Sequence, residues 1–226
     1  MLPEICMREN FVPRAVVFDM DGLMFDSERE VQYAWDVTGE EMGYGKLGHN
    51  IYHTLGLNKR AREAYFKEKY GQDFPYEEFQ ERYRSVVYEH TKQQGSRAKP
   101  GLYELLESLA KRGIPMAVAT SSSPEHAASY LENGKISGYF QTVVTGNMVT
   151  KAKPDPQIYQ IACEKLGVKP EEALALEDSY NGLRSAHRAG MKAVMVPDLL
   201  KDPSPVEDII YAKAETLLEV KEMFGW

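Results

Sequence analysis

The sequence predicts an α/β fold in which helices cover a parallel sheet and a block of helices is inserted after the first strand. Two observations support this prediction. From residue 102 to residue 196, short apolar runs alternate with amphipathic helical patterns, which is typical of a parallel sheet with right-handed crossovers. Residues 28–94 carry helical patterns alone and lack the runs of strand-forming residues.

Composition places the chain among ordinary globular proteins. It has 226 residues, of which 43% are hydrophobic and 27% are charged, enough for a core domain and a smaller companion. The formal net charge of −7 disfavours nucleic acid or an anionic membrane surface as a partner. Cys6 and Cys163 are the two cysteines, and they provide no spacing for a disulfide framework or a zinc site.

The sequence also indicates where the protein works. No apolar stretch is long enough to span a bilayer. Residues 1–14 contain Glu4 and Glu9 and lack the apolar segment of a signal peptide. We therefore expect a cytoplasmic protein, a monomer, that binds neither membrane nor nucleic acid.

The first predicted strand is the run Ala15–Phe18, which is apolar on both faces, as a central parallel strand is. Asp19 and Asp21 follow it, and Gly22 can adopt backbone angles that other residues avoid. Two carboxylates at this spacing repel each other unless a cation such as Mg²⁺ lies between them. Taken alone, the motif favours a polar turn after a strand over a metal site.

Helical patterns fill the block that follows. The first begins at Ser27, a good N-cap residue, and reaches Met42. Further helices are predicted at 59–70 and from Pro75 to the residue before Gly95, the last rich in tyrosines expected to pack in a core. The predicted domains are a core of residues 1–27 and 95–226 and a helical cap of residues 28–94.

The remaining chain alternates between the two kinds of element. Strands are predicted at 115–120, 142–145, 173–176 and 193–196. Helices are predicted at 102–112, 124–133, 155–166, 181–189 and 215–226.

Polar residues follow several of these strands. Because ligands bind outside the carboxyl ends of strands in such sheets, the residues at that edge are candidate site residues. They are Asp19, Asp21, Thr120, Ser121, Lys153, Glu177 and Asp178. Acids come from two strands, hydroxyls from a third, and a lysine precedes a helix. This set predicts carboxylates that bind Mg²⁺, facing donors for a phosphoryl group.

The same residues resemble the four motifs of the haloacid dehalogenase superfamily in its phosphatase branch. The motifs read Asp19-Met20-Asp21-Gly22, Thr120-Ser121, Lys153-Pro154 and Glu177-Asp178-Ser179. Residues 19–28 resemble the beta-phosphoglucomutase-like subgroup, whose helical cap is inserted after the first motif. The resemblance covers nearly the whole chain and implies a Rossmann-like, haloacid dehalogenase-like core.

The resemblance also implies a role for each residue. Asp19 would be the nucleophile that forms an aspartyl-phosphate, and Asp21 the general acid and then the base. Asp178, with Glu177 close by, would complete a Mg²⁺ site with Asp19 and the Asp21 carbonyl. The phosphoryl group would bind Thr120, the Ser121 amide and Lys153, with Gly22 letting the backbone approach it.

These roles predict a Mg²⁺-dependent phosphatase acting on a small phosphorylated metabolite, a sugar phosphate in the first instance. A phosphohexose mutase is the alternative, but mutases similar to this chain use a cap histidine at the position that matches Val31. In a mutase, another cap residue such as Arg60 or His53 would have to take the place of that histidine. Asp21 argues against carbon–halide cleavage, because similar dehalogenases lack the second aspartate. A non-enzymatic binding protein would have no need of every motif residue.

Residues outside the motifs receive structural interpretations. Lys151 is expected to be a solvated loop charge, and Ser122 and Ser123 are expected to cap the helix that begins at Pro124. The five histidines share no spacing, so each is expected at the surface or in the core: His49, His53, His90, His126 and His187.

Overall fold

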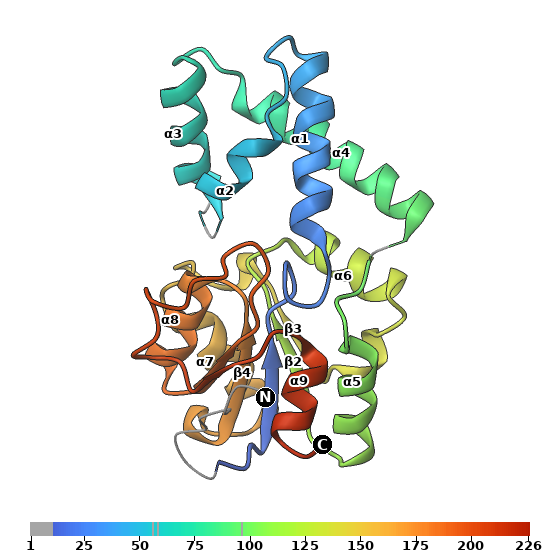
Figure 1. The fold of residues 1–226 in the computed structure, drawn as a ribbon, viewed down its shortest axis with the longest axis vertical. Coiled ribbons are helices and arrows are strands. Elements are labelled where there is room, and N and C mark those ends of the chain that lie inside the picture. Colours follow the sequence, from blue (N-terminus) through green and yellow to red (C-terminus); the bar gives the residue numbers. More distant parts are fainter. Residues whose placement is uncertain (1–10, 56, 58, 96) are drawn as a thin grey trace, which may run out of the picture. The chain divides into compact units, whose positions relative to one another are not determined.

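The computed structural model of the protein describes residues 11–55, 57, 59–95 and 97–226. Within them, six strands form one parallel sheet in the order β3-β2-β1-β4-β5-β6 (Figure 1). The strands are β1 (Ala15–Phe18), β2 (Met116–Ala119), β3 (Thr142–Val144), β4 (Ala173–Glu177), β5 (Lys192–Met195) and β6 (Ala212–Lys213). The predicted α/β fold class is confirmed.

Strand β1 lies inside the sheet and is buried along its whole length. Val17 is in register with Ala117 of β2 on one side and with Ala175 of β4 on the other. From β1 the chain builds outward to β2 and β3, then returns and builds the other way to β4, β5 and β6. The strand order therefore reverses at β1, and in open α/β sheets ligands bind at such a reversal, outside the carboxyl ends of the strands.

Helices cover both faces of the sheet. Alternate residues of β1 point to opposite faces, so each face presents apolar side chains to a different set of helices. Val16 and Phe18 pack with α5 (Leu102–Lys111), α6 (Pro124–Asn133) and α9 (Leu217–Met223). Ala15 and Val17 pack with α7 (Gln157–Leu166) and α8 (Tyr180–Ala189). Figure 1 shows α7 and α8 on one side of the sheet and α5 and α9 on the other. A strand buried on both faces must be apolar at every position, and this explains the uninterrupted apolar run.

Residues Asp26–Arg97 form a second compact unit of their own. Its helices are α1 (Ser27–Glu41), α2 (Ile51–Thr54), α3 (Lys59–Tyr70) and α4 (Tyr76–Gln94), and no strand occurs in its described part. Trp35 is fully buried, and its ring lies 5.2 Å from that of Phe66 and 5.8 Å from that of Tyr83, between centroids. The tyrosine-rich helix therefore packs in a core, as predicted. The assignment of residues 28–94 as a separate domain stays a prediction.

A few elements differ from the sequence prediction. Ser27 is the first residue of α1 and Asp26 is its N-cap, so the predicted cap was wrong by one position. The short helix α2 and the strand β6, which pairs with β5 at the edge of the described sheet, were not predicted. Elements this short contain too few residues to show a period.

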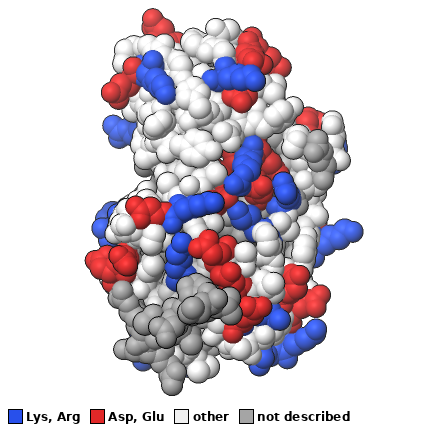
Figure 2. Space-filling model, viewed as in Figure 1, with Lys and Arg blue, Asp and Glu red and all other residues white. Residues whose placement is uncertain are grey.

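Among the described residues, no helix combines the length and apolar character needed to cross a membrane. The face drawn in Figure 2 carries lysines and arginines interspersed with acidic residues, and no extended basic surface is visible on it. The cytoplasmic location and the monomeric state stay predictions.

Candidate active site

Several segments bring polar side chains to the carboxyl edge of the sheet. Asp19 follows β1 and Thr120 follows β2. Glu177 ends β4 and Asp178 comes directly after it, while Lys153 lies in the loop between β3 and α7. Asp19, Thr120, Glu177 and Asp178 are all buried. Residues that are far apart in the sequence thus meet where the strand order reverses.

Lys153 lies at the centre of this group. Its Nζ is 2.5 Å from Oδ1 of Asp19, 2.5 Å from Oε1 of Glu177 and 3.0 Å from the carbonyl oxygen of Ala119. Its side chain is only 6% exposed. An ammonium group has three hydrogens to donate, so these three acceptors fix its position. The lysine therefore holds Asp19 and Glu177 together.

Burial and neighbouring charges shift the pKa values of this pair. Burial by itself lowers the pKa of Lys153, but Asp19 and Glu177 outweigh it, so the pKa is raised and the ammonium persists. Burial raises the pKa of Asp19 well above its usual value; Lys153 offsets part of this, and Glu177 and Asp21 add to it. The anionic form of Asp19 therefore needs more positive charge than Lys153 supplies.

Glu177 is held on both of its oxygens. Oε1 accepts a hydrogen bond from the Tyr159 hydroxyl at 2.9 Å, in addition to the one from Lys153. Oε2 accepts from the backbone N–H and the hydroxyl of Ser179, both at 3.0 Å. Burial raises the pKa of Tyr159 well above its usual value, so its hydroxyl stays a donor. Tyr159 lies on the apolar stripe of α7, and nothing in the sequence marks it as part of a site.

Asp19, Glu177 and Asp178 form a group of carboxylates able to hold a metal ion. One oxygen from each lies within 4.8 Å of the others. Gly22 has a φ of +80°, and a Cβ there would lie 3.0 Å from Cγ of Asp178, so a side chain would press on the ligand group. One lysine balances only one of the three carboxylates, and oxygen ligands suit Mg²⁺. The donor set fits a divalent cation.

Asp21 points to a different set of partners. Its Oδ2 accepts from the Ser122 hydroxyl at 2.7 Å and from the Thr120 hydroxyl at 3.2 Å. Its Oδ1 lies 3.2 Å from Nε2 of His126. The prediction that Ser122 caps a helix was wrong, because Ser123 alone is the N-cap of α6 and accepts from the His126 N–H. A role for Asp21 as a metal ligand through its carbonyl stays a prediction.

The substrate-binding roles of Thr120, Ser121, Lys153 and Gly22 also stay predictions. Thr120 is buried and accepts a hydrogen bond from the N–H of Ser122 at 3.0 Å. Ser121 is exposed and lies two residues after the end of β2. Lys151 is 75% exposed and 3.9 Å from Asp155, as expected of a solvated loop charge.

We expect Lys153→Met to lower the free energy of unfolding of the metal-free protein by about 3 kcal/mol at pH 7, because it leaves two buried carboxylates without their cation. Urea unfolding in chelator measures the change. Lys151→Met is the matched control and should change stability by less than about 0.5 kcal/mol. Equal effects of the two substitutions would contradict the buried role of Lys153.

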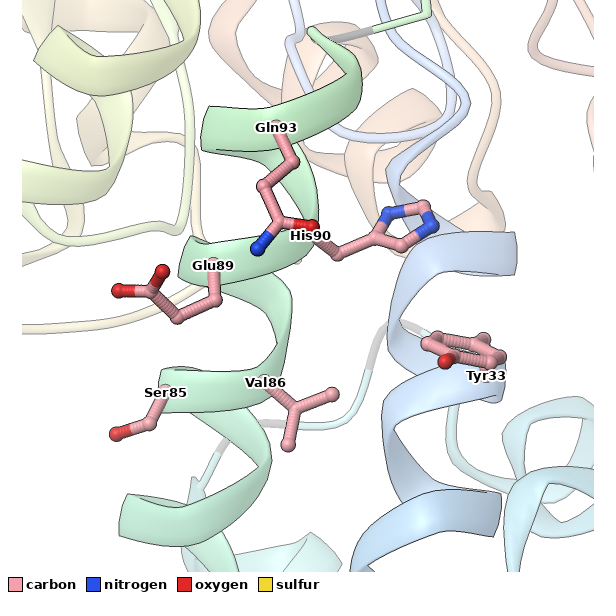
Figure 3. Close-up of a pocket in the computed structure, with 6 residues that line it drawn as sticks. All are labelled: Tyr33, Ser85, Val86, Glu89, His90 and Gln93. Atoms are coloured by element: carbon pink, nitrogen blue, oxygen red, sulfur yellow. The ribbon is translucent and has the colours of Figure 1, made fainter.

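The unit formed by residues 26–97 contains a separate cavity of about 340 Å³ between α1 and α4 (Figure 3). It is lined by Tyr33, Ser85, Val86, Glu89, His90 and Gln93. None of the predicted site residues contributes to it. His90, which faces Tyr33 at 5.1 Å between ring centroids, leaves its buried Nδ1 without a hydrogen-bond partner.

Comparison with known proteins agrees with this architecture. Residues 16–196 match the family described as haloacid dehalogenase-like hydrolase. The phosphorylated carbohydrates phosphatase of Thermotoga maritima is 32% identical over 185 residues, which cover 80% of this chain and 83% of that protein.

Two solved structures share the fold. CbbY of Rhodobacter sphaeroides, in complex with a xylulose bisphosphate, superposes with a TM-score of 0.80 at 24% identity, covering 92% of this chain and 96% of that one. The beta-phosphoglucomutase of Clostridium difficile has a TM-score of 0.77 at 16% identity, covering 95% and 98%. With a family match over most of its length, the chain belongs to the haloacid dehalogenase-like hydrolases, among the phosphatases with a beta-phosphoglucomutase-like fold.

Proposed function

We propose that this protein is a Mg²⁺-dependent phosphatase that releases inorganic phosphate from a small phosphorylated metabolite. The substrate class that we propose is the sugar phosphates. The observation that carries the proposal is the arrangement of Lys153 between Asp19 and Glu177, with Asp178 beside them. The relative from Thermotoga maritima, a phosphorylated carbohydrates phosphatase, supports the sugar phosphate as substrate class.

In the proposed first step, an oxygen of Asp19 attacks phosphorus and the bond between phosphorus and the ester oxygen breaks. The leaving oxygen takes its proton from Asp21. In the second step, water attacks the aspartyl-phosphate, Asp21 takes a proton from that water, and Asp19 is released with inorganic phosphate. The same carboxyl group thus acts as acid and then as base.

Lys153 has two tasks in this scheme. Its ammonium reduces the repulsion between the anionic nucleophile and the anionic substrate, and it holds Asp19 at a fixed distance from Glu177. Asp19, Asp178 and the carbonyl of Asp21 would bind Mg²⁺, with Glu177 adding negative charge. The ion would neutralise charge on the phosphoryl oxygens.

Hydrolysis is favoured over transfer within a sugar because of one residue. In mutases that resemble this chain, a cap histidine allows the aspartate that matches Asp21 to act as a base only when sugar is bound. Val31 stands at the position of that histidine on α1. A valine can neither donate nor accept a proton. Water should therefore hydrolyse the aspartyl-phosphate before a sugar intermediate can reorient in the site and accept the phosphoryl group.

The test is phosphate release from a panel of phosphorylated metabolites with Mg²⁺ present. We expect free phosphate from at least one sugar phosphate. In a separate assay, a hexose 1-phosphate is supplied with a trace of its bisphosphate and both products are followed. Rapid formation of the 6-phosphate without free phosphate would identify a mutase and contradict this proposal.

A further inference from the structure

The side chain of His126 lies against the carboxylate of Asp21. His126 is in the first turn of α6, and Ser123 caps that turn by accepting the His126 N–H at 3.3 Å. The cap fixes the backbone at this point, and the ring of His126 then reaches Asp21, with Nε2 at 3.2 Å from Oδ1. The two residues are separated by 105 positions in the chain, so the contact is made by the tertiary fold.

The ring of His126 is held from its other side. Its centroid lies 4.5 Å from that of Tyr130, one turn further along α6. Tyr130 is 2% exposed and packs edge-on against Phe25 at 5.3 Å. Phe25 belongs to the loop that follows Asp21. Through Tyr130, the ring of His126 is therefore packed against the same loop that carries Asp21.

The partners of Asp21 are divided between its two oxygens. The hydroxyls of Ser122 and Thr120 donate to Oδ2, and His126 lies at Oδ1. Donors on both oxygens fix the rotation of a carboxyl group about its Cβ–Cγ bond. A carboxylate and a carboxylic acid both retain an acceptor oxygen. The Nε2–H of His126 can therefore hold Asp21 in either form.

The contact between His126 and Asp21 is partly open to solvent. The side chains of His126 and Asp21 are 32% and 25% exposed, so the contact lies at the edge of the site and Asp21 stays accessible. A general acid must meet the leaving oxygen at hydrogen-bond distance and in a narrow range of directions. A group that fixes Asp21 without covering it suits this task.

We propose that His126, together with Ser122, is a positioning residue that orients the Asp21 carboxyl group toward the leaving oxygen. This inference rests on the proposed phosphatase function. In the step it assists, the bond between phosphorus and the leaving oxygen breaks while the proton of Asp21 passes to that oxygen. Neither His126 nor Ser122 gains or loses a proton overall.

The experiment compares two substrates that differ in how much they need a general acid. An alkyl phosphate, such as a sugar phosphate, has a leaving oxygen that must be protonated, whereas p-nitrophenyl phosphate leaves readily as an anion. The variant His126→Phe keeps the ring that packs on Tyr130 and removes the N–H donor. We expect kcat/KM for the alkyl phosphate, which reports formation of the aspartyl-phosphate, to fall about tenfold to a hundredfold. For the aryl phosphate kcat/KM should fall less than about threefold, because its leaving oxygen needs no proton and the later hydrolysis step does not contribute to kcat/KM.

Two further variants make the reading specific. His126→Gln returns an N–H donor at a similar reach and should recover most of the lost turnover on the alkyl phosphate. Ser122→Ala, a smaller change on the other oxygen of Asp21, should show the same selective loss and serves if His126→Phe does not fold, as judged by a thermal scan. His187→Phe, at an exposed position of α8, is the matched control and should leave both rates unchanged.

An equal loss on both substrates, or no loss on either, would overturn the positioning role while leaving the phosphatase proposal intact. The absence of phosphate release by the unmodified protein from every substrate would instead overturn the proposed function itself. Selective loss with rescue by glutamine supports the inference.

Discussion

Replacing Asp19 with asparagine lowers kcat by about four orders of magnitude or more, if Asp19 is the nucleophile that we propose. The side chain keeps its shape but loses the charged oxygen that attacks phosphorus. Lys153 still keeps Glu177 as a partner at 2.5 Å, so the site is not left with an unpaired cation. Turnover of a sugar phosphate with saturating Mg²⁺ measures the effect.

The same substitution should not unfold the protein. Burial, Glu177 and Asp21 all disfavour the charge on Asp19, so an uncharged amide removes part of that cost. We expect the melting temperature of the metal-free variant to be equal to or above that of the unmodified protein. Asp73→Asn, at an exposed position of the 26–97 unit, is the control and should leave turnover within about twofold.

A direct observation distinguishes a nucleophile from a residue that acts only as a metal ligand. Quenching the unmodified enzyme with acid during turnover should trap phosphate on the peptide that carries Asp19, detected by mass spectrometry. Phosphate trapped on a different peptide, or full activity of the Asp19→Asn variant, would contradict the assignment of Asp19 as the nucleophile.

The second large effect concerns the metal. We expect a chelator to abolish phosphate release and Mg²⁺ to restore it, because Asp19, Glu177 and Asp178 form an all-oxygen group with excess negative charge. Ca²⁺, with its larger and looser coordination shell, should restore little. Full activity in excess chelator would contradict the metal site.

Metal binding should also be visible without turnover. At a concentration one hundred times its Kd, Mg²⁺ should add about 2.7 kcal/mol to the free energy of unfolding, measured by urea unfolding. Asp178→Asn should remove most of this gain. Asp155→Asn, in the loop before α7 and 3.9 Å from the exposed Lys151, should retain it.

The pH dependence follows from the raised pKa of Asp19. Because the folded-state pKa of Asp19 lies above its value of about 4 in the unfolded chain, the metal-free protein loses stability as the pH rises from about 4 through that raised value. Mg²⁺ binds the ionised carboxylates and opposes this loss. The stabilisation by Mg²⁺ should therefore grow as the pH rises above about 4. A constant gain over this range would mean that Asp19 is already ionised without the metal.

Most helices could be predicted because their apolar residues recur with a helical period, and the longer strands because each is a short apolar run. The helices at Lys59–Tyr70 and Pro124–Asn133 have the predicted bounds. The β1 run could be placed inside the sheet because only a strand buried on both faces is apolar at each position. The elements that were missed, α2 and β6, have four and two residues, too few to show a period.

The candidate site was predicted unevenly for the same kind of reason. Asp19, Glu177 and Asp178 stand in motifs at strand ends, and Lys153 stands in a motif in the loop between β3 and α7. The sheet brings these segments to one edge. Tyr159 and His126 have no motif of their own. Each lies on a helix with a period that is explained by packing, so the sequence gives no sign that its polar atom reaches a carboxylate.

By itself, then, the sequence determined which charged and hydroxyl residues follow each predicted strand. These residues indicated the family and the kind of chemistry. Which donor meets which acceptor was decided only by the tertiary structure. Ser122 and Ser123 show the difference, since they are adjacent and chemically identical, yet one caps α6 and the other binds Asp21. A hydrogen bond depends on distance and direction between atoms, and these are set by the packing of β1 against β2 and of α6 against the sheet.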